Sequence, residues 1–306
     1  MITAVFFIRT PCFLYSAPLY HLSRIYCKID LMDHAFLVAT DMDYTLLLPG
    51  MPVSDKNREA IRAIRDLGGE LTLSTGRSSF LTGIYTEDLD IRIPIITSNG
   101  AAVFDPVTRR EIYSSLIPQE KAEKLARLFL DQDLDVTAYS PEGLILFPGS
   151  TRGDFINRYN EGLPDRIKAV VKPLEDDLPP INKFLVIAPD EKTADMLRQD
   201  EDLEVMFSAS DFLDVMRAGN TKGFGLRLVR EAVLGDKGLT FALGDGENDL
   251  SMIREADHGI AMKGSSEDLL READYVTTRD CGEDGFAEAV FDYIIPTVKR
   301  SLRSSC

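Results

Sequence analysis

AFLVATDMDYTLL, residues 35–47, contains the clearest buried strand in this sequence. A run that is almost entirely apolar until it meets a carboxylate is typical of a strand buried on both faces of a parallel sheet. Asp41 and Asp43 follow two positions apart, and positions i and i+2 of a strand share a face. Both acids are therefore expected to point into the crevice beyond the strand ends, where open α/β sheets bind ligands. The simpler alternative is that Asp41 only caps the following turn.

Strands and helices alternate on both sides of the middle of the chain. Ser54 can cap a helix after the first strand, and further strands are expected at 70–75 and 93–98. The alternation returns late, with a helix that begins near Lys222 and a strand at 239–245. This order predicts an α/β fold, a Rossmann-like parallel sheet covered by helices.

The middle of the chain, residues 117–216, has a different pattern. Helices are expected at 118–130 and 152–161, among several short strands that are joined by turn residues. Neighbouring short strands of this kind predict an antiparallel sheet with helices on one face. We therefore expect an inserted α+β domain between the two parts of a core domain, residues 33–116 and 217–306.

Composition and charge limit the classes of partner. Lysine and arginine number 34 against 50 aspartates and glutamates, so the net charge is −16. Such an acidic surface repels phosphate backbones, and nucleic acid is not an expected partner. No run approaches the roughly 20 apolar residues of a membrane span, so no membrane association is expected. The four cysteines are far apart without a C-x-x-C pair, which argues against a disulfide framework or zinc cluster and favours the reducing cytoplasm.

Residues 1–32 differ in composition from the rest, being rich in aromatic side chains with Asp30 as the single acid. A signal peptide would carry positive charge before its apolar stretch, whereas here Arg9 and Pro11 interrupt that stretch. Since the globular pattern begins at about residue 33, we expect this extension to be a mis-called start or a disordered segment.

Two further motifs suggest a phosphate-binding site. STGR, residues 74–77, places a threonine hydroxyl and a glycine N–H after an apolar strand, as a phosphate cradle would. TKG, residues 221–223, places Lys222 in the first turn of a helix, where the macrodipole disfavours a cation unless an anion holds it there. Taken singly, a threonine cap and a solvated lysine are the more common explanations of these motifs.

The fourth motif, GDGENDLSMI at 244–253, concentrates acids directly after an apolar strand. Asp245, Glu247 and Asp249 would repel one another unless a cation lay among them, which indicates a hard metal bound by oxygen. A solvated acidic turn is the alternative. The apolar strand before the motif and the amphipathic helix after it favour a position at the sheet edge.

The four motifs in this order, with SNGA at 98–101 between the second and third, resemble those of the haloacid dehalogenase (HAD) superfamily. They are most similar to its Cof-type branch, subclass IIB, over about residues 33–293. The resemblance implies a HAD core with an inserted cap of the C2B type. It also implies an enzyme, a phosphatase that hydrolyses phosphoric monoesters.

The resemblance implies a role for each acid. Asp41 would be the nucleophile and a Mg²⁺ ligand, and Asp43 the acid/base residue that also binds the metal through its backbone carbonyl. Asp245 would be a further ligand, and Asp249 would support the metal site. The residues expected around the phosphoryl group or at the mouth of the site are Met42, Thr75, Gly76, Asn99, Gly100, Lys222 and Asn248.

The sequence departs from the Cof-type pattern in two places. Tyr44 stands where the family usually has glycine, and AMKGSSED at 261–268 lacks the Gly-Asn-Ala that commonly follows Ala-Met. A bulky Tyr44 would leave the carboxylates intact but narrow the space for the leaving group or contact it. For the cap, we expect specificity contacts from Tyr139, Ser140 and Glu142.

These observations predict a Mg²⁺-dependent phosphomonoester hydrolase that acts on a small phosphorylated metabolite, such as a sugar phosphate, through an aspartyl phosphate. A phosphosugar mutase would keep the aspartyl phosphate for return to the substrate. A non-catalytic phosphometabolite-binding module could use the same acids, hydroxyl and lysine. A proton shuttle beside the nucleophile argues against this last alternative, because it speeds loss of the phosphoryl group. The sequence carries no expectation about oligomeric state.

Overall fold

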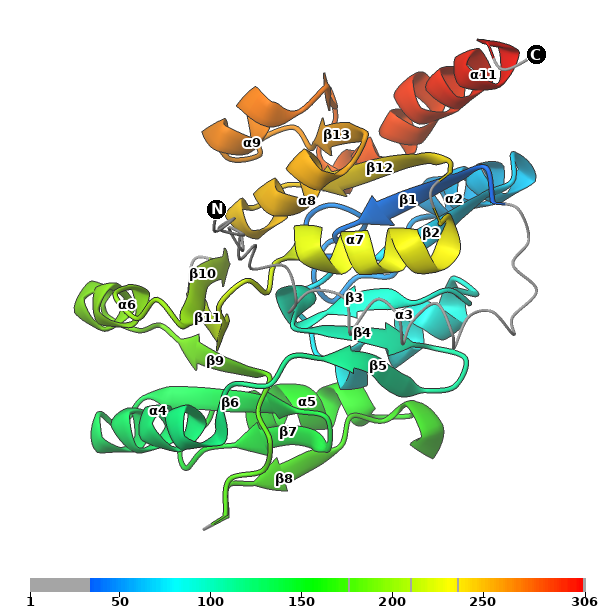
Figure 1. Ribbon diagram of the computed structural model, residues 1–306. Coiled ribbons are helices and arrows are strands. Elements are labelled where there is room, and N and C mark those ends of the chain that lie inside the picture. Colours follow the sequence, from blue (N-terminus) through cyan, green and yellow to red (C-terminus); the bar gives the residue numbers. More distant parts are fainter. Residues whose placement is uncertain (1–33, 176, 210, 236, 305–306) are drawn as a thin grey trace, which may run out of the picture.

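The computed structural model describes residues 34–304 except 176, 210 and 236, so the expectation for residues 1–32 lies outside the described part. Its centre is a parallel sheet in the order β14-β13-β12-β1-β2 (Figure 1). The strands are β1 (Phe36–Thr40), β2 (Gly69–Leu73), β12 (Leu239–Gly244), β13 (His258–Ala261) and β14 (Tyr275–Val276). The predicted α/β fold with a parallel sheet is confirmed.

Helices cover both faces of this sheet. Along β1, Phe36 and Val38 belong to one apolar cluster, and Leu37 and Ala39 belong to another. The first cluster is closed by α2 (Asp55–Asp66), α10 (Gly285–Glu288) and the π-helix η6 (Ala289–Ile294), which continues into α11 (Ile295–Ser304). The second is closed by α7 (Lys222–Val233), α8 (Leu250–Glu255) and α9 (Glu267–Glu272). A strand buried on both sides must be apolar at every position, which is why residues 36–39 do not alternate.

A small antiparallel sheet adjoins the parallel one. It consists of β3 (Ile95–Thr97), β4 (Ala102–Asp105) and β5 (Arg110–Ser114). A single bridge between Ser74 and Ile96 joins β3 to the end of β2. The strand expected at 93–98 therefore exists, but its regular partner is a hairpin strand. The connection from β2 contains η1 (Ser79–Leu81) and α3 (Gly83–Asp88).

A second unit, called the inserted unit below, lies between β5 and α7, and its strand β11 runs to Arg217, one residue beyond the expected bound of 216. Its six-stranded sheet has the order β10-β11-β9-β6-β7-β8, antiparallel except for the pair β7 and β8. The strands are β6 (Asp135–Ser140), β7 (Gly143–Leu146), β8 (Val171–Pro173), β9 (Lys183–Ile187), β10 (Leu203–Ala209) and β11 (Phe212–Arg217). The helices are α4 (Gln119–Asp131), α5 (Arg152–Asn160), η3 (Asp165–Ile167) and α6 (Glu191–Arg198).

The expectation that the helices of the inserted unit share one face of its sheet is wrong. The apolar cluster on one face combines α4 and α6 with residues such as Ala138 and Phe184. The next residues along the same strands, Tyr139 and Leu185, contact α5 on the opposite face instead. Because Leu81 of the core joins this second cluster, α5 lies between the inserted sheet and the core. The period-2 alternation of β6 and β9 thus builds two apolar surfaces.

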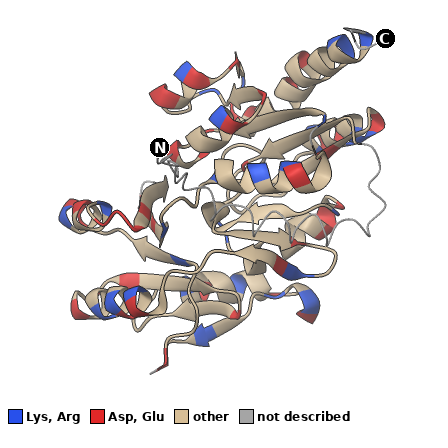
Figure 2. Ribbon diagram, viewed as in Figure 1, with Lys and Arg blue, Asp and Glu red and all other residues tan. Residues whose placement is uncertain are grey.

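Basic and acidic residues alternate along helices such as α4 and α6 (Figure 2). The five strands of the parallel sheet contain a single charged residue, Glu70. Among the described residues, no helix is both long and apolar enough to cross a membrane.

Asn57 ties the loop after β1 to the C-terminal helices. It is 2% exposed, and its amide donates to the carbonyl of Leu46 at 2.9 Å while accepting from the N–H of Ala287 at 3.1 Å. The loop that carries Asp41 and Asp43 is thereby fixed to a segment more than 200 residues away in the sequence.

We predict that Asn57→Ala lowers the free energy of unfolding by about 2–3 kcal/mol, because it leaves a buried carbonyl and a buried N–H without partners. The control is Glu59→Ala on the same helix, whose side chain is exposed. Urea midpoints at unchanged slope measure both. Equal losses in the two variants would contradict this role for Asn57.

Candidate active site

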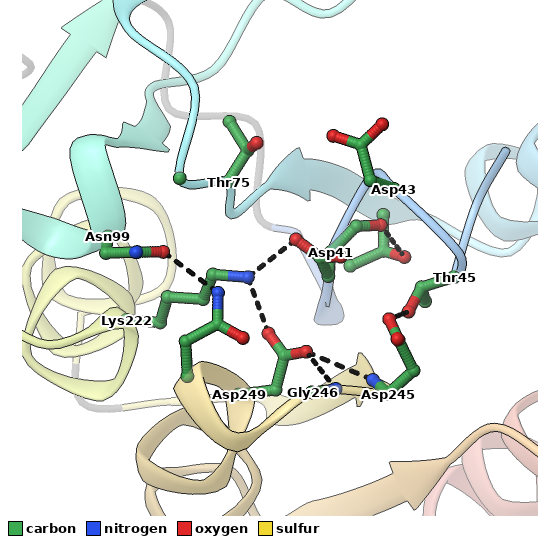
Figure 3. A network of polar contacts seen from close by, with 12 residues as sticks. Asp41, Asp43, Thr45, Thr75, Asn99, Lys222, Asp245, Gly246 and Asp249 are labelled. Atoms are coloured by element: carbon green, nitrogen blue, oxygen red, sulfur yellow. Dashed lines mark hydrogen bonds and ion pairs between the residues drawn. The ribbon is translucent and has the colours of Figure 1, made fainter. Parts of the chain in front are cut away.

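The candidate residues gather at the carboxyl ends of the parallel strands. Asp41 follows β1, Thr75 follows β2 after one residue, and Asp245 follows β12. Parallel strands place these ends at one edge of the sheet, so residues about 200 positions apart meet there. Figure 3 shows this group together with Asn99 and Lys222.

Lys222 is the buried centre of the group. It is fully buried, and its Nζ lies 2.6 Å from an oxygen of Asp41 and 2.6 Å from an oxygen of Asp249 (Figure 3). Thr221 caps the helix by accepting from the N–H of Phe224 at 3.2 Å, which fixes where α7 begins. The position of Lys222 in the first helical turn is thus explained by the two carboxylates that hold it.

Three carboxylates lie close enough to share a metal ion. Ligand oxygens of Asp41, Asp245 and Asp249 all lie within 4.8 Å of one another. Asp249 accepts from the N–H groups of Asp245 and Gly246 at 3.0 Å each. Thr45 donates its hydroxyl to Asp245 at 2.8 Å. Carboxylate oxygens on rigid turns are the ligands that Mg²⁺ and Ca²⁺ prefer.

The electrostatics of these acids are those of crowded buried anions. Burial raises the pKa of Asp41 well above its usual value, against the opposing attraction of Lys222. Burial, followed by the charge of Asp249, raises the pKa of Asp245 to about 6. Burial lowers the pKa of Lys222, but Asp249 and Asp41 outweigh it and the net shift is upward. The pocket therefore holds more negative charge than Lys222 can balance, and a cation would relieve the excess.

Asp43 lies apart from the contacts of Lys222 and pairs with Arg77. The guanidinium donates to both carboxylate oxygens, with Nε at 2.8 Å and Nη2 at 2.5 Å. Arg77 also donates to the hydroxyl of Tyr85 at 3.0 Å. The STGR motif contained Arg77, but its spacing gave no reason to assign it a partner. The four carboxylates Asp41, Asp43, Asp245 and Asp249 thus outnumber the two cations that pair with them, Arg77 and Lys222.

The remaining predicted residues surround this centre. Thr75 accepts from the N–H of Arg77 at 3.1 Å, and Asn248 donates to Asn99 at 3.1 Å.

Gly100 has φ 94° and lies so close to Thr221 that a Cβ would collide with its carbonyl. Met42 is buried, and Gly76 lies against the amide of Asn99. The structure thus brings all the predicted motif residues to one place, while their roles stay predictions.

A cavity of about 680 Å³ opens from this centre toward the inserted unit. Its lining includes Asp41, Asp245 and Asn248 on the core side. Tyr139 is among the lining residues from the inserted unit, whereas Ser140 and Glu142 are not. Glu142 pairs with Lys172 at the surface. The expectation that Ser140 and Glu142 line the site is therefore not met in this structure.

Comparison with known proteins agrees with this geometry. A family model for haloacid dehalogenase-like hydrolases matches residues 38–290. The chain belongs to this family. The predicted superfamily and hydrolase class are thereby confirmed.

Several relatives match this HAD hydrolase over most of the length of both chains. The 5-amino-6-(5-phospho-D-ribitylamino)uracil phosphatase YcsE of Bacillus subtilis is 29% identical over 262 residues, which cover 85% of this chain and 96% of that protein. The pyridoxal phosphate phosphatase YbhA of Escherichia coli is 24% identical over 278 residues, covering 85% and 98%. A solved sugar phosphatase of HAD subclass IIB is 25% identical with a TM-score of 0.69, covering 85% of this chain and 99% of that one.

The departure at Tyr44 has a structural cost in this HAD hydrolase. Its φ is 64°, in the left-handed region where glycine is unstrained and other residues cost about 1 kcal/mol or more. Tyr44 is 54% exposed and lines the cavity. The turn thus has a backbone conformation that suits glycine, while the tyrosine side chain forms part of the cavity wall.

A buried ion pair of the inserted unit contacts the STGR loop and Asn99 of the core. Lys183 and Asp214 are 1% and 0% exposed, and Nζ of Lys183 lies 2.8 Å from the Asp214 carboxylate. Lys183 also donates to the carbonyl of Gly76 at 2.6 Å. Asp214 accepts from Asn99 at 2.5 Å. Sequence analysis missed this pair because a lysine and an aspartate in strands 31 residues apart carry no motif.

We predict that Lys183→Met lowers the free energy of unfolding by about 3–5 kcal/mol, because it leaves the Asp214 carboxylate buried without its cation. Lys183→Met combined with Asp214→Asn should recover part of the loss, since the buried charge is gone. The control, Lys172→Met, breaks an exposed pair with Glu142 and should change stability by about 1 kcal/mol or less. Thermal unfolding measures the four proteins, and a double variant less stable than Lys183→Met would contradict the account.

Proposed function

We propose that the protein is a Mg²⁺-dependent phosphomonoester hydrolase that acts on a small phosphorylated metabolite through an aspartyl phosphate on Asp41. The observation that carries the proposal is Lys222, whose Nζ lies 2.6 Å from both Asp41 and Asp249. A buried cation beside a carboxylate nucleophile is what attack on an anionic ester requires, because the two anions would otherwise repel each other. Because the cysteines of the chain are far apart in the sequence, we also propose that the protein works in the cytoplasm.

The acid cluster fits a magnesium ion. Asp41 and Asp245 would hold it by their carboxylates, Asp43 by its backbone carbonyl, and Asp249 would support them. When bound, the ion would neutralise phosphate oxygens and add to the electrostatic stabilisation of charge in the transition state. Close spacing of the oxygens of Asp41, Asp245 and Asp249, within 4.8 Å, supports this assignment.

The phosphoryl group would be held by residues of three motifs. Lys222 and Asn248 come from the third and fourth, and Thr75 with the N–H of Gly76 comes from the second. The N–H of Met42, next to the nucleophile, would donate to the same group. Asn99 contacts Asn248 directly, and Gly100 permits the close approach to Thr221 that positions Lys222. These groups would orient the phosphorus for in-line attack by an oxygen of Asp41.

Asp43 would move the protons. Protonated, it would donate to the leaving alcohol, and as a carboxylate it would then take a proton from the water that hydrolyses the aspartyl phosphate. Both of its oxygens accept from Arg77 in the present arrangement. A protonated Asp43 can accept fewer hydrogen bonds, so one of its two hydrogen bonds with Arg77 would break when the carboxylate takes up a proton. Arg77 would therefore act as a positioning residue for Asp43.

The inserted unit would act as the cap over this site. Its Lys183 already reaches the carbonyl of Gly76, and its aromatic residues line the far side of the cavity. A closed cap would exclude bulk water from the aspartyl phosphate and supply the contacts that select the substrate.

We predict that chelation abolishes hydrolysis of 4-nitrophenyl phosphate and that added Mg²⁺ restores it. Asp245→Asn should lower kcat/KM by about 100-fold or more, because it removes a metal ligand. Asp292→Asn, which changes an exposed acid outside the cluster, should leave the rate unchanged. Steady-state kinetics after dialysis against chelator provide the measurement, and full activity without metal would refute the metal requirement.

We predict that replacing each of the two acids of the first motif blocks a different step of the reaction. Asp43→Asn should lower turnover by about 10²- to 10⁴-fold, the usual loss for a proton shuttle, while an ester with a good leaving group still phosphorylates Asp41. Asp41→Asn should give neither turnover nor phosphoenzyme. Rapid quench followed by intact mass spectrometry distinguishes the variants. Turnover by Asp41→Asn, or binding of phosphometabolites without any hydrolysis by the wild type, would favour a binding module over an enzyme.

A further inference from the structure

The cavity beyond the phosphate-binding residues has walls of unusual composition. Six aromatic side chains line it, from both the core and the inserted unit: Tyr44, Tyr85, Tyr139, Phe155, Tyr159 and Phe212. Aromatic faces offer few hydrogen-bond partners. Where it lies against these faces, a polyhydroxylated leaving group would lose hydration without recovering it, whereas an unsaturated ring could stack on them.

One face of α5 carries most of the wall from the inserted unit. Arg152, Phe155 and Tyr159 occupy positions i, i+3 and i+7, which lie on one side of a helix, and all three line the cavity. Ile156, one position beyond Phe155, packs into the apolar cluster beneath. Burial raises the pKa of Tyr159 to about 12, so its hydroxyl stays a neutral donor at physiological pH.

Arg152 contacts two aromatic rings of the cavity wall. Its guanidinium lies 4.1 Å from the ring centre of Phe155 and 5.5 Å from that of Phe212. Within the described part of the chain, no carboxylate forms an ion pair with it, although acids outnumber bases by 50 to 34. Of the other cations that line the same cavity, Arg77 and Lys183 are paired with aspartates, and Arg158 is exposed to solvent.

Arg152 is therefore available to an anionic ligand, whereas Arg77 and Lys183 already pair with aspartates. The Phe155 and Phe212 rings hold its guanidinium by cation–π contact and leave its N–H groups for an acceptor. An anion in this cavity, at the inserted-unit side, would be separate from the phosphoryl group held by Lys222.

We propose that the preferred substrates are phosphomonoesters whose leaving group is a planar unsaturated ring bearing a second anionic oxygen, which Arg152 binds. Phe155, Phe212 and Tyr139 flank the ring and select it over aliphatic and polyhydroxylated groups. This inference rests on the proposed function, since it assigns the leaving group of the same hydrolysis.

Three matched esters test it: cyclohexylmethyl phosphate, benzyl phosphate and 4-carboxybenzyl phosphate. All are phosphates of primary alcohols, so they differ mainly in the ring and in the added carboxylate. We expect kcat/KM to rise at each step in this order, by about tenfold for the carboxylate, chiefly through KM. Arg152→Gln should remove the preference for the carboxylate and keep that for the aromatic ring. Arg62→Gln, an exposed arginine on α2, should change neither.

The outcomes separate the two proposals. If the wild type hydrolyses the three esters alike, or if Arg152→Gln keeps the carboxylate preference, the assignment of the leaving group is wrong and the hydrolase stands. If no ester is hydrolysed, the proposed function fails. Calorimetric Kd values for the same esters with Asp41→Asn then still test the inference: the same order of affinity, lost in Asp41→Asn/Arg152→Gln, supports it, and equal affinities overturn it.

Discussion

The buried contact of Lys222 with Asp41 and Asp249 is the interaction on which the site depends. It joins the end of β1 to the start of α7, 181 residues later in the sequence, and to the turn after β12, at the edge of one parallel sheet. Removing a buried partner from such a network is costly, because the charge left behind has lost its hydration. The network also leaves excess negative charge, so the same residues that fix the local structure could hold a divalent cation, and under the proposed function they would also position a phosphoryl group.

The core of the fold could be predicted because its signals are local. Residues 36–39 are apolar at every position, and that pattern specifies burial on both faces. The motif residues could be placed because each lies at a strand end or a helix start. The hairpin of β4 and β5 and the position of α5 between the two sheets escaped prediction, since both are set by packing between segments that no periodicity connects.

The same distinction holds within the site. Asp41 and Lys222 belong to motifs with recognisable spacing, whereas Lys183, Asp214 and Arg152 lie in the inserted unit without one. They can be recognised only from three-dimensional contacts. Lys183 of the ion pair reaches the carbonyl of Gly76, and the guanidinium of Arg152 lies against aromatic rings. Residues that select a leaving group have to match one ligand and need not follow a pattern common to a family.

The central claim is that Lys222 serves the phosphoryl group while the carboxylates serve the metal. Electron paramagnetic resonance of bound Mn²⁺, with and without orthovanadate as a phosphate analogue, measures both in one sample. The wild type should bind one Mn²⁺ and then vanadate. Lys222→Gln should bind Mn²⁺ at least as tightly, because a competing positive charge is gone, and should no longer bind vanadate. Retention of vanadate by Lys222→Gln, or loss of its Mn²⁺, would contradict the account.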